Sequence, residues 1–298
     1  MNLGNFAQRA LVALVGIPIV VFITLERPLA LLALLFILGI LCAMEFYGLA
    51  KAKGFLAQEN LGMGLTGMVI LAFGPFTLNG YIFGGETSRF TTLPLLEIVL
   101  ALSLILVLAI EMFRKLPNPY NHIAITLAGI FYIGIGLGSF YGIREYFHVR
   151  SVAPPSPTII EPGLFLVIML ASIWICDTAA YFGGKTMGKN KLFERISPNK
   201  TWEGAAWGLV FAIGTWFAAR ALFADQLSGI SAVDAIMLGL IVGVVGQMGD
   251  LAESLLKRDA GVKDSSNLIP GHGGVLDRLD SILFVSPLTF LYLYVAGV

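Results

Sequence analysis

The chain has 298 residues, of which 57% are hydrophobic and 13% are charged, and its mean hydropathy is +0.84. Soluble globular domains carry about 25% charged residues, so this composition excludes them and predicts an integral membrane protein. The formal net charge is zero, which argues against a nucleic-acid-binding protein. The two cysteines, Cys42 and Cys176, both lie in apolar stretches and therefore do not indicate a disulfide framework.

Nine apolar stretches approach the roughly 17–25 residues that a membrane-spanning helix needs, although the first is slightly short. They cover residues 10–25, 29–48, 61–78, 93–112, 123–141, 163–182, 202–222, 233–251 and 281–297. No small-residue cleavage site follows the first stretch, so we interpret it as a retained helix. Because backbone groups in lipid must pair within their own segment, the sequence predicts an all-α, polytopic membrane helix bundle of about nine transmembrane helices.

The basic residues predict how the bundle is oriented. With nine spans, 14 of the 19 Lys and Arg residues fall on the side of the amino terminus and five on the other. Positive residues prefer the cytoplasmic side, so we expect the amino terminus inside and the carboxyl terminus outside. We divide the chain into amino-terminal helices (1–160) and a carboxyl-terminal catalytic region (161–298), with cytosolic loops at 183–203 and 252–280.

The loop after the sixth span is strongly basic and follows an acid inside that span. Asp177 lies within the apolar stretch, where a carboxylate needs a partner or a cavity, and a basic residue is the expected partner. Ser197 or Thr201 could cap the next helix, which is the purely structural interpretation. Four other acids near span ends are interpreted as interfacial and are excluded from the site: Glu45, Glu97, Glu111 and Glu253.

The densest charge in the chain lies between Ser254 and Asp280, where apolar spans flank it on both sides. Asp250 ends the eighth span just before this stretch. Asp277 and Asp280 are three residues apart, so a helix entering the ninth span would place both carboxylates on one face. Mg²⁺ prefers such oxygen ligands, completed by water and substrate phosphates. Alternatively, Asp277 and Asp280 could simply complement the dipole at a helix start.

A glycine-rich turn, Pro270-Gly-His-Gly-Gly274, precedes that helix start. Glycines let backbone N–H groups turn towards an anion, and the helix beginning near Leu276 adds its positive end. His272 could donate to a phosphate or assist proton transfer, or it could be a solvated residue in a plain turn. The preceding bases, Lys257, Arg258 and Lys263, could neutralise phosphates or attract anionic headgroups.

These residues resemble the signature of phosphatidate cytidylyltransferases, also called CDP-diacylglycerol synthases. The resemblance is carried by Ser254-Leu-Leu-Lys-Arg258, Lys263-Asp264, Pro270-Gly-His-Gly-Gly274 and Asp277-Arg-Leu-Asp280. Cys176–Tyr181 (CDTAAY) and Ser197–Gly204 (SPNKTWEG) also resemble bacterial members of that family. The resemblance covers residues 165–298, whereas the first five spans match only as hydrophobic helices.

The resemblance implies an Mg²⁺-dependent enzyme of phospholipid biosynthesis, with a second metal ion as an option, that converts CTP and phosphatidic acid into CDP-diacylglycerol and pyrophosphate. It implies a multi-pass protein of the bacterial inner membrane that contacts membrane lipids, has its active site facing the cytoplasm and forms a homodimer. Expected metal ligands and catalytic residues are Asp250, Asp277 and Asp280, with Lys257, Arg258 and His272 as further catalytic residues. Expected substrate-binding residues are Ser197, Lys200, Thr201, Lys263, Asp264, Gly271, Gly273, Gly274 and Arg278, with Asp177 orienting a base or supporting the metal.

Two other interpretations stay open at this point. A CDP-alcohol phosphotransferase would also use several aspartates with Mg²⁺, but its longer aspartate motif is absent from the sequence. An anion transporter would place charges along the midplane of several helices and is often built from internal repeats. The sequence shows no evident repeat, and its charges cluster at one face.

Overall fold

The computed structural model describes residues 3–75, 77–79, 92–152, 160–269 and 273–298, and nearly all of these are helical. The amino-terminal half comprises α1 (Leu3–Glu26), α2 (Pro28–Ala52), α3 (Glu59–Ala72), α5 (Thr92–Arg114), α6 (Pro119–Gly129), the π-helical turn η1 (Ile130–Ile135) and α7 (Gly136–Val152). The carboxyl-terminal half comprises α8 (Pro162–Met187), α9 (Trp202–Leu222), α10 (Ala232–Leu240), the π-helical turn η2 (Ile241–Gly246), α11 (Gln247–Asp259) and α12 (Leu276–Ala296).

The helical membrane fold predicted from the sequence is confirmed. Within the described ranges, seven helices are long and apolar enough to cross a membrane. Two shorter apolar segments, Leu14–Glu26 within α1 and Glu59–Ala72 (α3), coincide with the first and third predicted spans. The count of nine crossings and the inside-to-outside orientation therefore stay predictions.

Both predicted cytosolic loops contain more regular structure than expected. The eighth span continues as α11 to Asp259, so much of the charge after Asp250 lies on a helix. The loop at 183–203 contains an antiparallel pair of strands, β1 (Lys191–Phe193) and β2 (Ser197–Thr201), which the all-α prediction omitted. Strands this short and polar lack the alternating apolar pattern by which a strand is identified in a sequence.

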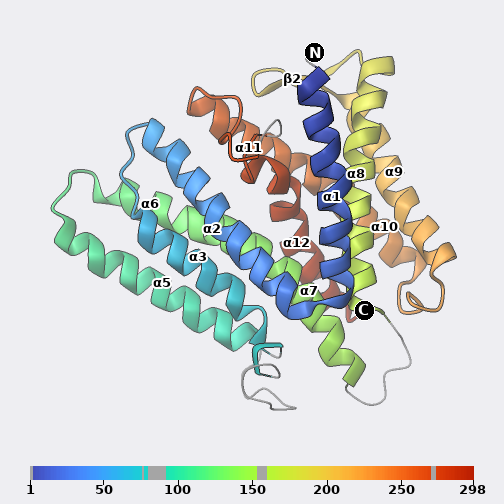
Figure 1. The fold of residues 1–298 in the computed structure, drawn as a ribbon, viewed down its shortest axis with the longest axis horizontal. Coiled ribbons are helices and arrows are strands. Elements are labelled where there is room, and N and C mark those ends of the chain that lie inside the picture. Colours follow the sequence, from blue (N-terminus) through green and yellow to red (C-terminus); the bar gives the residue numbers. More distant parts are fainter. Residues whose placement is uncertain (1–2, 76, 80–91, 153–159, 270–272) are drawn as a thin grey trace.

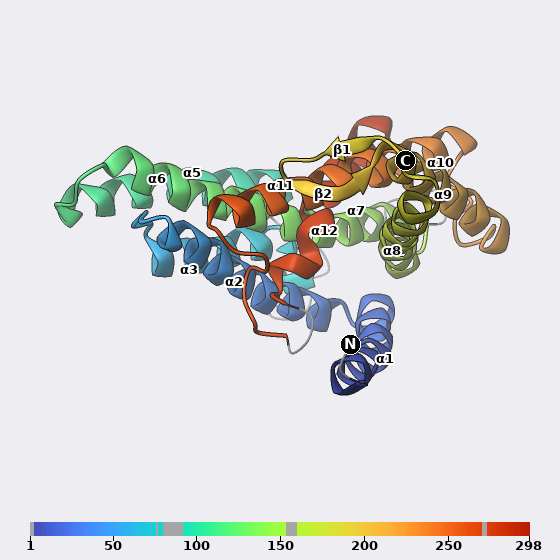
Figure 2. The same ribbon diagram turned by 90° about the horizontal axis from the view of Figure 1, so that it is seen from above.

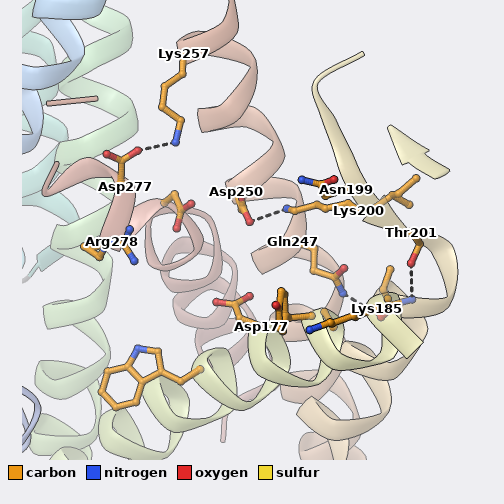
Figure 3. A pocket seen from close by; sticks show the side chains of 18 of the residues that line it. Asp177, Lys185, Asn199, Lys200, Thr201, Gln247, Asp250, Lys257, Asp277 and Arg278 are labelled. Carbon is orange, nitrogen blue, oxygen red and sulfur yellow. Dashed lines mark hydrogen bonds and ion pairs between the residues drawn. The ribbon is translucent and has the colours of Figure 1, made fainter. Parts of the chain in front are cut away.

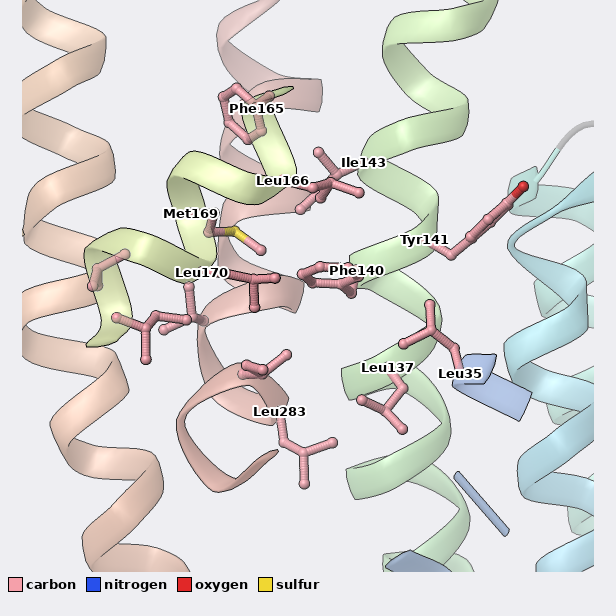
Figure 4. Packing of buried hydrophobic residues seen from close by; sticks show 14 of the residues in the cluster. Leu35, Leu137, Phe140, Tyr141, Ile143, Phe165, Leu166, Met169, Leu170 and Leu283 are labelled. Carbon is pink, nitrogen blue, oxygen red and sulfur yellow. The ribbon is translucent and has the colours of Figure 1, made fainter. Parts of the chain in front are cut away.

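The helices of the two halves pack around a shared centre. In Figure 1, α2, α3, α5 and α6 lie on one side, α8, α9 and α10 on the other, and α7 and α12 between them. One continuous cluster of buried apolar side chains joins α2, α7, α8 and α12, including Leu35, Leu137, Leu170 and Leu283 (Figure 4). The carboxyl-terminal region is therefore packed directly against helices of the amino-terminal half.

Close helix contact in the carboxyl-terminal half depends on small residues. A Cβ atom placed on Gly239 of α10 would lie 2.5 Å from the Cα atom of Ile213 in α9. A side chain there would push the two helices apart, which explains why the sequence has glycine at this position.

The charged elements gather at one end of the bundle. The two strands, α11 and the beginning of α12 lie together at the end where α1 begins, and α12 ends at the opposite end (Figures 1 and 2). Residues that are far apart in the sequence thus meet on one side of the apolar helices.

Candidate active site

A cavity of about 750 Å³ lies where α8, the two strands, α11 and the first turn of α12 meet (Figure 3). Nine charged side chains contribute to its lining, in contrast to the apolar helices around it. They are the acids Asp177, Asp250, Asp264, Asp277 and Asp280 and the bases Lys185, Lys200, Lys257 and Arg278. A polar cavity at the end of a hydrophobic bundle can bind a charged ligand beside a membrane.

The strand pair holds Lys200 over the cavity. Thr201 ends β2 and caps α9, because its hydroxyl oxygen accepts a hydrogen bond from the Gly204 amide at 3.2 Å. Glu203 in the first turn of α9 accepts hydrogen bonds from the Lys189 amide at 3.1 Å and from Asn190 Nδ2 at 2.7 Å. The loop on either side of the strands is thereby fixed to the start of α9.

Lys200 forms an ion pair that links the strands to α11. Its Nζ atom lies 2.7 Å from Asp250 Oδ2, and Ser254 donates to the other carboxylate oxygen at 3.3 Å. Both partners of the ion pair are partly exposed, with relative side-chain accessibilities of 25% for Lys200 and 36% for Asp250. Because solvent screens such an exposed pair, it contributes only about 0–1 kcal/mol to folding stability. Its main effect is to fix the positions of the two side chains in the cavity.

Lys257 is held between two acids on neighbouring helices. Its Nζ atom donates to Asp277 Oδ1 at 2.6 Å and contacts the carboxylate of Glu253, one turn earlier in α11. The relative side-chain accessibilities are 11% for Lys257, 4% for Asp277 and zero for Glu253. A single ammonium group thus partly compensates two buried carboxylates and joins α11 to α12.

Asp277 also organises the segment that leads into α12. Its Oδ2 atom accepts hydrogen bonds from the amides of Ser265 at 2.9 Å and Gly274 at 2.7 Å, and from the Ser265 hydroxyl at 2.9 Å. Gly273 has a φ of +82°, a left-handed conformation that glycine adopts without strain. Asp277 therefore holds α11 through Oδ1 and the segment before α12 through Oδ2.

Asp280 and Asp177 are much less engaged. Among the residues that the structure describes, Asp280 accepts only the adjacent Ser281 amide, at 2.7 Å, and Asp177 forms no hydrogen bond or ion pair. Both carboxylates interact electrostatically with Asp250. A cation that binds among these carboxylates would reduce the electrostatic repulsion between them.

The donor set of the cavity fits a magnesium ion that is completed by substrate. No three His, Cys, Asp or Glu side chains converge closely enough to hold a metal by themselves within the described residues. Mg²⁺ usually takes only one or two carboxylates and completes its shell with water and phosphate oxygens. Asp280 and the partly exposed Asp250, which would share its carboxylate with Lys200, can supply those carboxylates. Asp277 would have to release Lys257 or the amides of Ser265 and Gly274.

The structure brings many of the predicted site residues together. Nine of them line the cavity: Asp177, Lys200, Thr201, Asp250, Lys257, Asp264, Asp277, Arg278 and Asp280. Five described ones do not line it: Ser197, Arg258, Lys263, Gly273 and Gly274. Arg258 is exposed and donates to the Val262 carbonyl at 3.2 Å, and Lys263 is also exposed. Gly271 and His272 lie outside the described residues.

Several residues were missed from the sequence. Lys185, Asn199 and Gln247 line the cavity. The interfacial interpretation of Glu253 and Glu45 was wrong, because both are buried, although neither lines the cavity. Glu253 contacts Lys257, and Glu45 accepts hydrogen bonds from Ser265, Ser266, Val275 and Leu276. Nothing in the sequence distinguishes them from the exposed Glu97, since all three are acids near span ends. Glu111 is also buried rather than interfacial, but it lies outside the cavity.

Comparison with known proteins identifies the same family as the signature residues. Residues 7–296 match the cytidylyltransferase family. The phosphatidate cytidylyltransferase of Bacillus subtilis (strain 168) is 34% identical over 296 residues, covering 98% of this chain and 98% of that protein. The phosphatidate cytidylyltransferase of Synechocystis sp. is 32% identical over 282 residues, covering 88% and 87%. The chain therefore belongs to the cytidylyltransferase family, and it is a nucleotidyltransferase enzyme.

Proposed function

We propose that this enzyme transfers the cytidylyl group of CTP to phosphatidate, which gives CDP-diacylglycerol and pyrophosphate. The observation that carries the proposal is the cavity itself, in which four basic side chains and several acids adjoin apolar helices. One substrate is a soluble triphosphate and the other is a lipid, so the reaction needs a polar site beside a membrane. The names of the related enzymes support the same reaction.

In this reaction a phosphate oxygen of phosphatidate attacks the α-phosphorus of CTP. The bond from that phosphorus to the oxygen bridging to the β-phosphate breaks, and pyrophosphate leaves with the bond's electron pair. The protein makes no covalent bond, so catalysis relies on positioning and on compensating negative charge. Three basic residues face the cavity from three different elements: Lys200, Lys257 and Arg278. They can contact the triphosphate of CTP and the phosphate of phosphatidate.

Asp250 and Asp280 are the residues that would hold Mg²⁺, with Asp177 facing the same space. When bound, the ion would supply positive charge that neutralises the phosphates, and a second ion could share this role. Asp277, one turn before Asp280, instead fixes Lys257, Ser265 and Gly274. Lys200 keeps Asp250 pointed towards the cavity.

We assign the enzyme to the inner membrane of a bacterium, with the cavity facing the cytoplasm. The apolar helices and the bacterial relatives support the membrane, and the excess of basic residues at the cavity end supports the orientation. CTP is a cytosolic nucleotide, which fits that side. The family resemblance also favours a homodimer, which light scattering of the purified protein in detergent would test.

The proposed function is tested by product analysis. Purified protein is incubated in detergent with CTP, dioleoyl phosphatidate and Mg²⁺, and lipids and pyrophosphate are quantified by mass spectrometry and a coupled assay. We expect CDP-diacylglycerol and pyrophosphate in equal amounts, and neither product with Asp280→Asn. Consumption of CDP-diacylglycerol with an added alcohol would instead indicate a phosphotransferase. Anion flux through vesicles without any product would indicate a transporter.

A further inference from the structure

Glu45 links the amino-terminal half of the chain to the candidate active site. It lies in α2, its relative accessibility is 4%, and its carboxylate accepts backbone hydrogen bonds from the very start of α12. The Val275 amide donates to Oε1 at 2.9 Å across 230 positions of sequence, and the Leu276 amide donates to Oε2 at 2.8 Å. The carboxylate thus occupies the positive end of a helix on which Asp277, Arg278 and Asp280 all lie.

Two serine hydroxyls complete the shell of the Glu45 carboxylate. Ser266 Oγ lies 2.6 Å from Oε1, and Ser265 Oγ lies 2.8 Å from Oε2. A Cβ atom on Gly274 would collide with both Ser265 Oγ and the Glu45 carboxylate, so any other residue there would displace these two groups. Within the described part of the chain Glu45 forms no ion pair, and its carboxylate is hydrogen-bonded to Ser265, Ser266, Val275 and Leu276.

We propose that Glu45 is a positioning residue for the transfer reaction. It holds Ser265, Ser266 and the first turn of α12 in the arrangement that directs Arg278 and Asp280 towards the cavity. Asp277 secures the same segment from the other side through Ser265 and Gly274. This role rests on the proposed function, since it treats the cavity as the active site. Through Glu45, the otherwise apolar helix α2 would help to position active-site residues.

The test compares Glu45→Gln with Glu111→Gln. Glu111 is a matched control because it is also a buried carboxylate with three polar partners, Gln58, Arg114 and His122, but lies outside the cavity. In Glu45→Gln the amide nitrogen cannot accept the N–H groups that faced the carboxylate. We expect kcat to fall at least tenfold and the Mg²⁺ concentration for half-maximal activity to rise about tenfold. Glu111→Gln should change both values less than threefold.

Hydrogen exchange measures the same contact without turnover. The peptide containing Val275 and Leu276 should take up deuterium at least tenfold faster in Glu45→Gln, and at the wild-type rate in Glu111→Gln. Unchanged exchange together with an unchanged Mg²⁺ requirement would overturn the positioning role, even if the amount of folded protein fell. If the wild-type protein makes no CDP-lipid, the proposed function fails, while the exchange comparison still decides whether Glu45 holds the start of α12.

A second, apolar cavity supports an independent inference. It has a volume of about 360 Å³ and lies between α1, α2, α7, α8 and α12, with Leu31, Leu38 and Phe140 in its lining. Trp174 and Arg278 line both this cavity and the polar one, so the two adjoin. From Leu38 to Leu31 the apolar cavity follows α2 for about 10 Å, taking 1.5 Å per helical residue.

The geometry points to this apolar cavity as the binding site for an acyl chain of the lipid substrate, an inference that rests on the proposed function. Arg278 stands where the polar and apolar cavities meet, and phosphatidate has its phosphate next to its acyl chains. A phosphate at Arg278 would therefore place the hydrocarbon along α2 and α12, where its burial is favourable. Two other apolar pockets, one lined by Trp207 and one by Phe223, share no lining residue with the charged cavity.

Narrowing the apolar cavity tests the inference. Gly16 lines it and has open space around its Cβ position, so Gly16→Phe fills the cavity without a backbone collision. Gly64→Phe on α3 is the matched control, since Gly64 also has open space and lines neither cavity. We expect Gly16→Phe to lower kcat/KM for dioleoyl phosphatidate at least fivefold more than for dioctanoyl phosphatidate. The control should keep the wild-type ratio.

Binding without turnover provides the second readout for the acyl-chain site. Phosphatidate with a photoreactive group midway along one acyl chain should label peptides of α1 or α12 that contain Ile17 or Ile282. Equal losses for both chain lengths in Gly16→Phe, or labelling confined to other helices, would overturn the inference. Absence of product with either chain length in the wild-type protein would count against the proposed function instead.

Discussion

Lys257 Nζ donates a hydrogen bond to Asp277 Oδ1 at 2.6 Å and thereby joins the last turn of α11 to the first turn of α12. The other oxygen of Asp277 accepts backbone amides of the preceding turn. Asp280 lies one turn later, lines the same cavity and accepts only a neighbouring amide among the described residues. The two acids of the Asp-Arg-Leu-Asp motif therefore have separable tasks.

Asp277→Asn and Asp280→Asn should both abolish activity but differ in stability. Asp277 accepts hydrogen bonds from Lys257, Ser265 and Gly274, and a hydrogen bond to a charged group is worth roughly 1.5–3 kcal/mol, so Asp277→Asn should lower the midpoint of thermal unfolding in detergent. Asp280→Asn removes no ion pair and should unfold within a few degrees of the wild-type protein while losing at least a hundredfold in kcat. Equal stability of the two variants would contradict this division of tasks.

Lys200→Met should impair substrate binding without unfolding the protein. Its partly exposed pair with Asp250 contributes only about 0–1 kcal/mol to stability, but its ammonium group faces the cavity. We expect KM for CTP to rise at least tenfold. Lys191→Met is the control, because Lys191 lies in the same strand pair, bonds the Pro198 carbonyl at 2.6 Å and does not line the cavity. A similar loss in both variants would exclude a specific role for Lys200.

Removing divalent cations should stop the reaction reversibly. Treatment with EDTA should abolish product formation, and added Mg²⁺ should restore it, because the cavity carboxylates and the substrate phosphates need a compensating cation. Asp250→Asn should need about tenfold more Mg²⁺ for half-maximal activity, measured by titration at saturating CTP. Full activity in EDTA would rule out the proposed metal.

Cysteine labelling tests the orientation. Cys42 and Cys176 are buried, so a single new cysteine can be labelled selectively. In intact spheroplasts, an impermeant maleimide should label Asp225→Cys, beyond the end of α9, but not Phe193→Cys in β1 until the membrane is broken. The reverse pattern would place the cavity outside the cell.

Much of the fold was predictable because lipid imposes one simple rule on the backbone. Continuous apolar stretches indicated each long helix, and the start of α12 at Leu276 matched the expected position. The π-helical turns η1 and η2 and the strands at 191–201 were not predicted, since no length or periodicity marks them. The number of crossings depends on α1 and α3, whose apolar segments Leu14–Glu26 and Glu59–Ala72 do not by themselves decide the matter.

The candidate site was predictable where its residues are close in sequence. Asp277, Arg278 and Asp280 share one helical turn and a recognisable motif, and all line the cavity. Glu45 could not be found in this way, because its partners lie 220 or more positions away and only the packing of α2 against α12 brings them together. The task of Asp277 was also hidden, since Lys257 reaches it from a different helix.

The most direct test of the account follows the phosphorus atoms of CTP. Purified enzyme with phosphatidate and Mg²⁺ is given CTP labelled either at the α-phosphorus or at the γ-phosphorus, and the lipid and aqueous phases are counted separately. The account predicts that the α-label enters the lipid and the γ-label appears only in pyrophosphate. Transfer of the γ-label to the lipid, or no labelled lipid with either nucleotide, would contradict it.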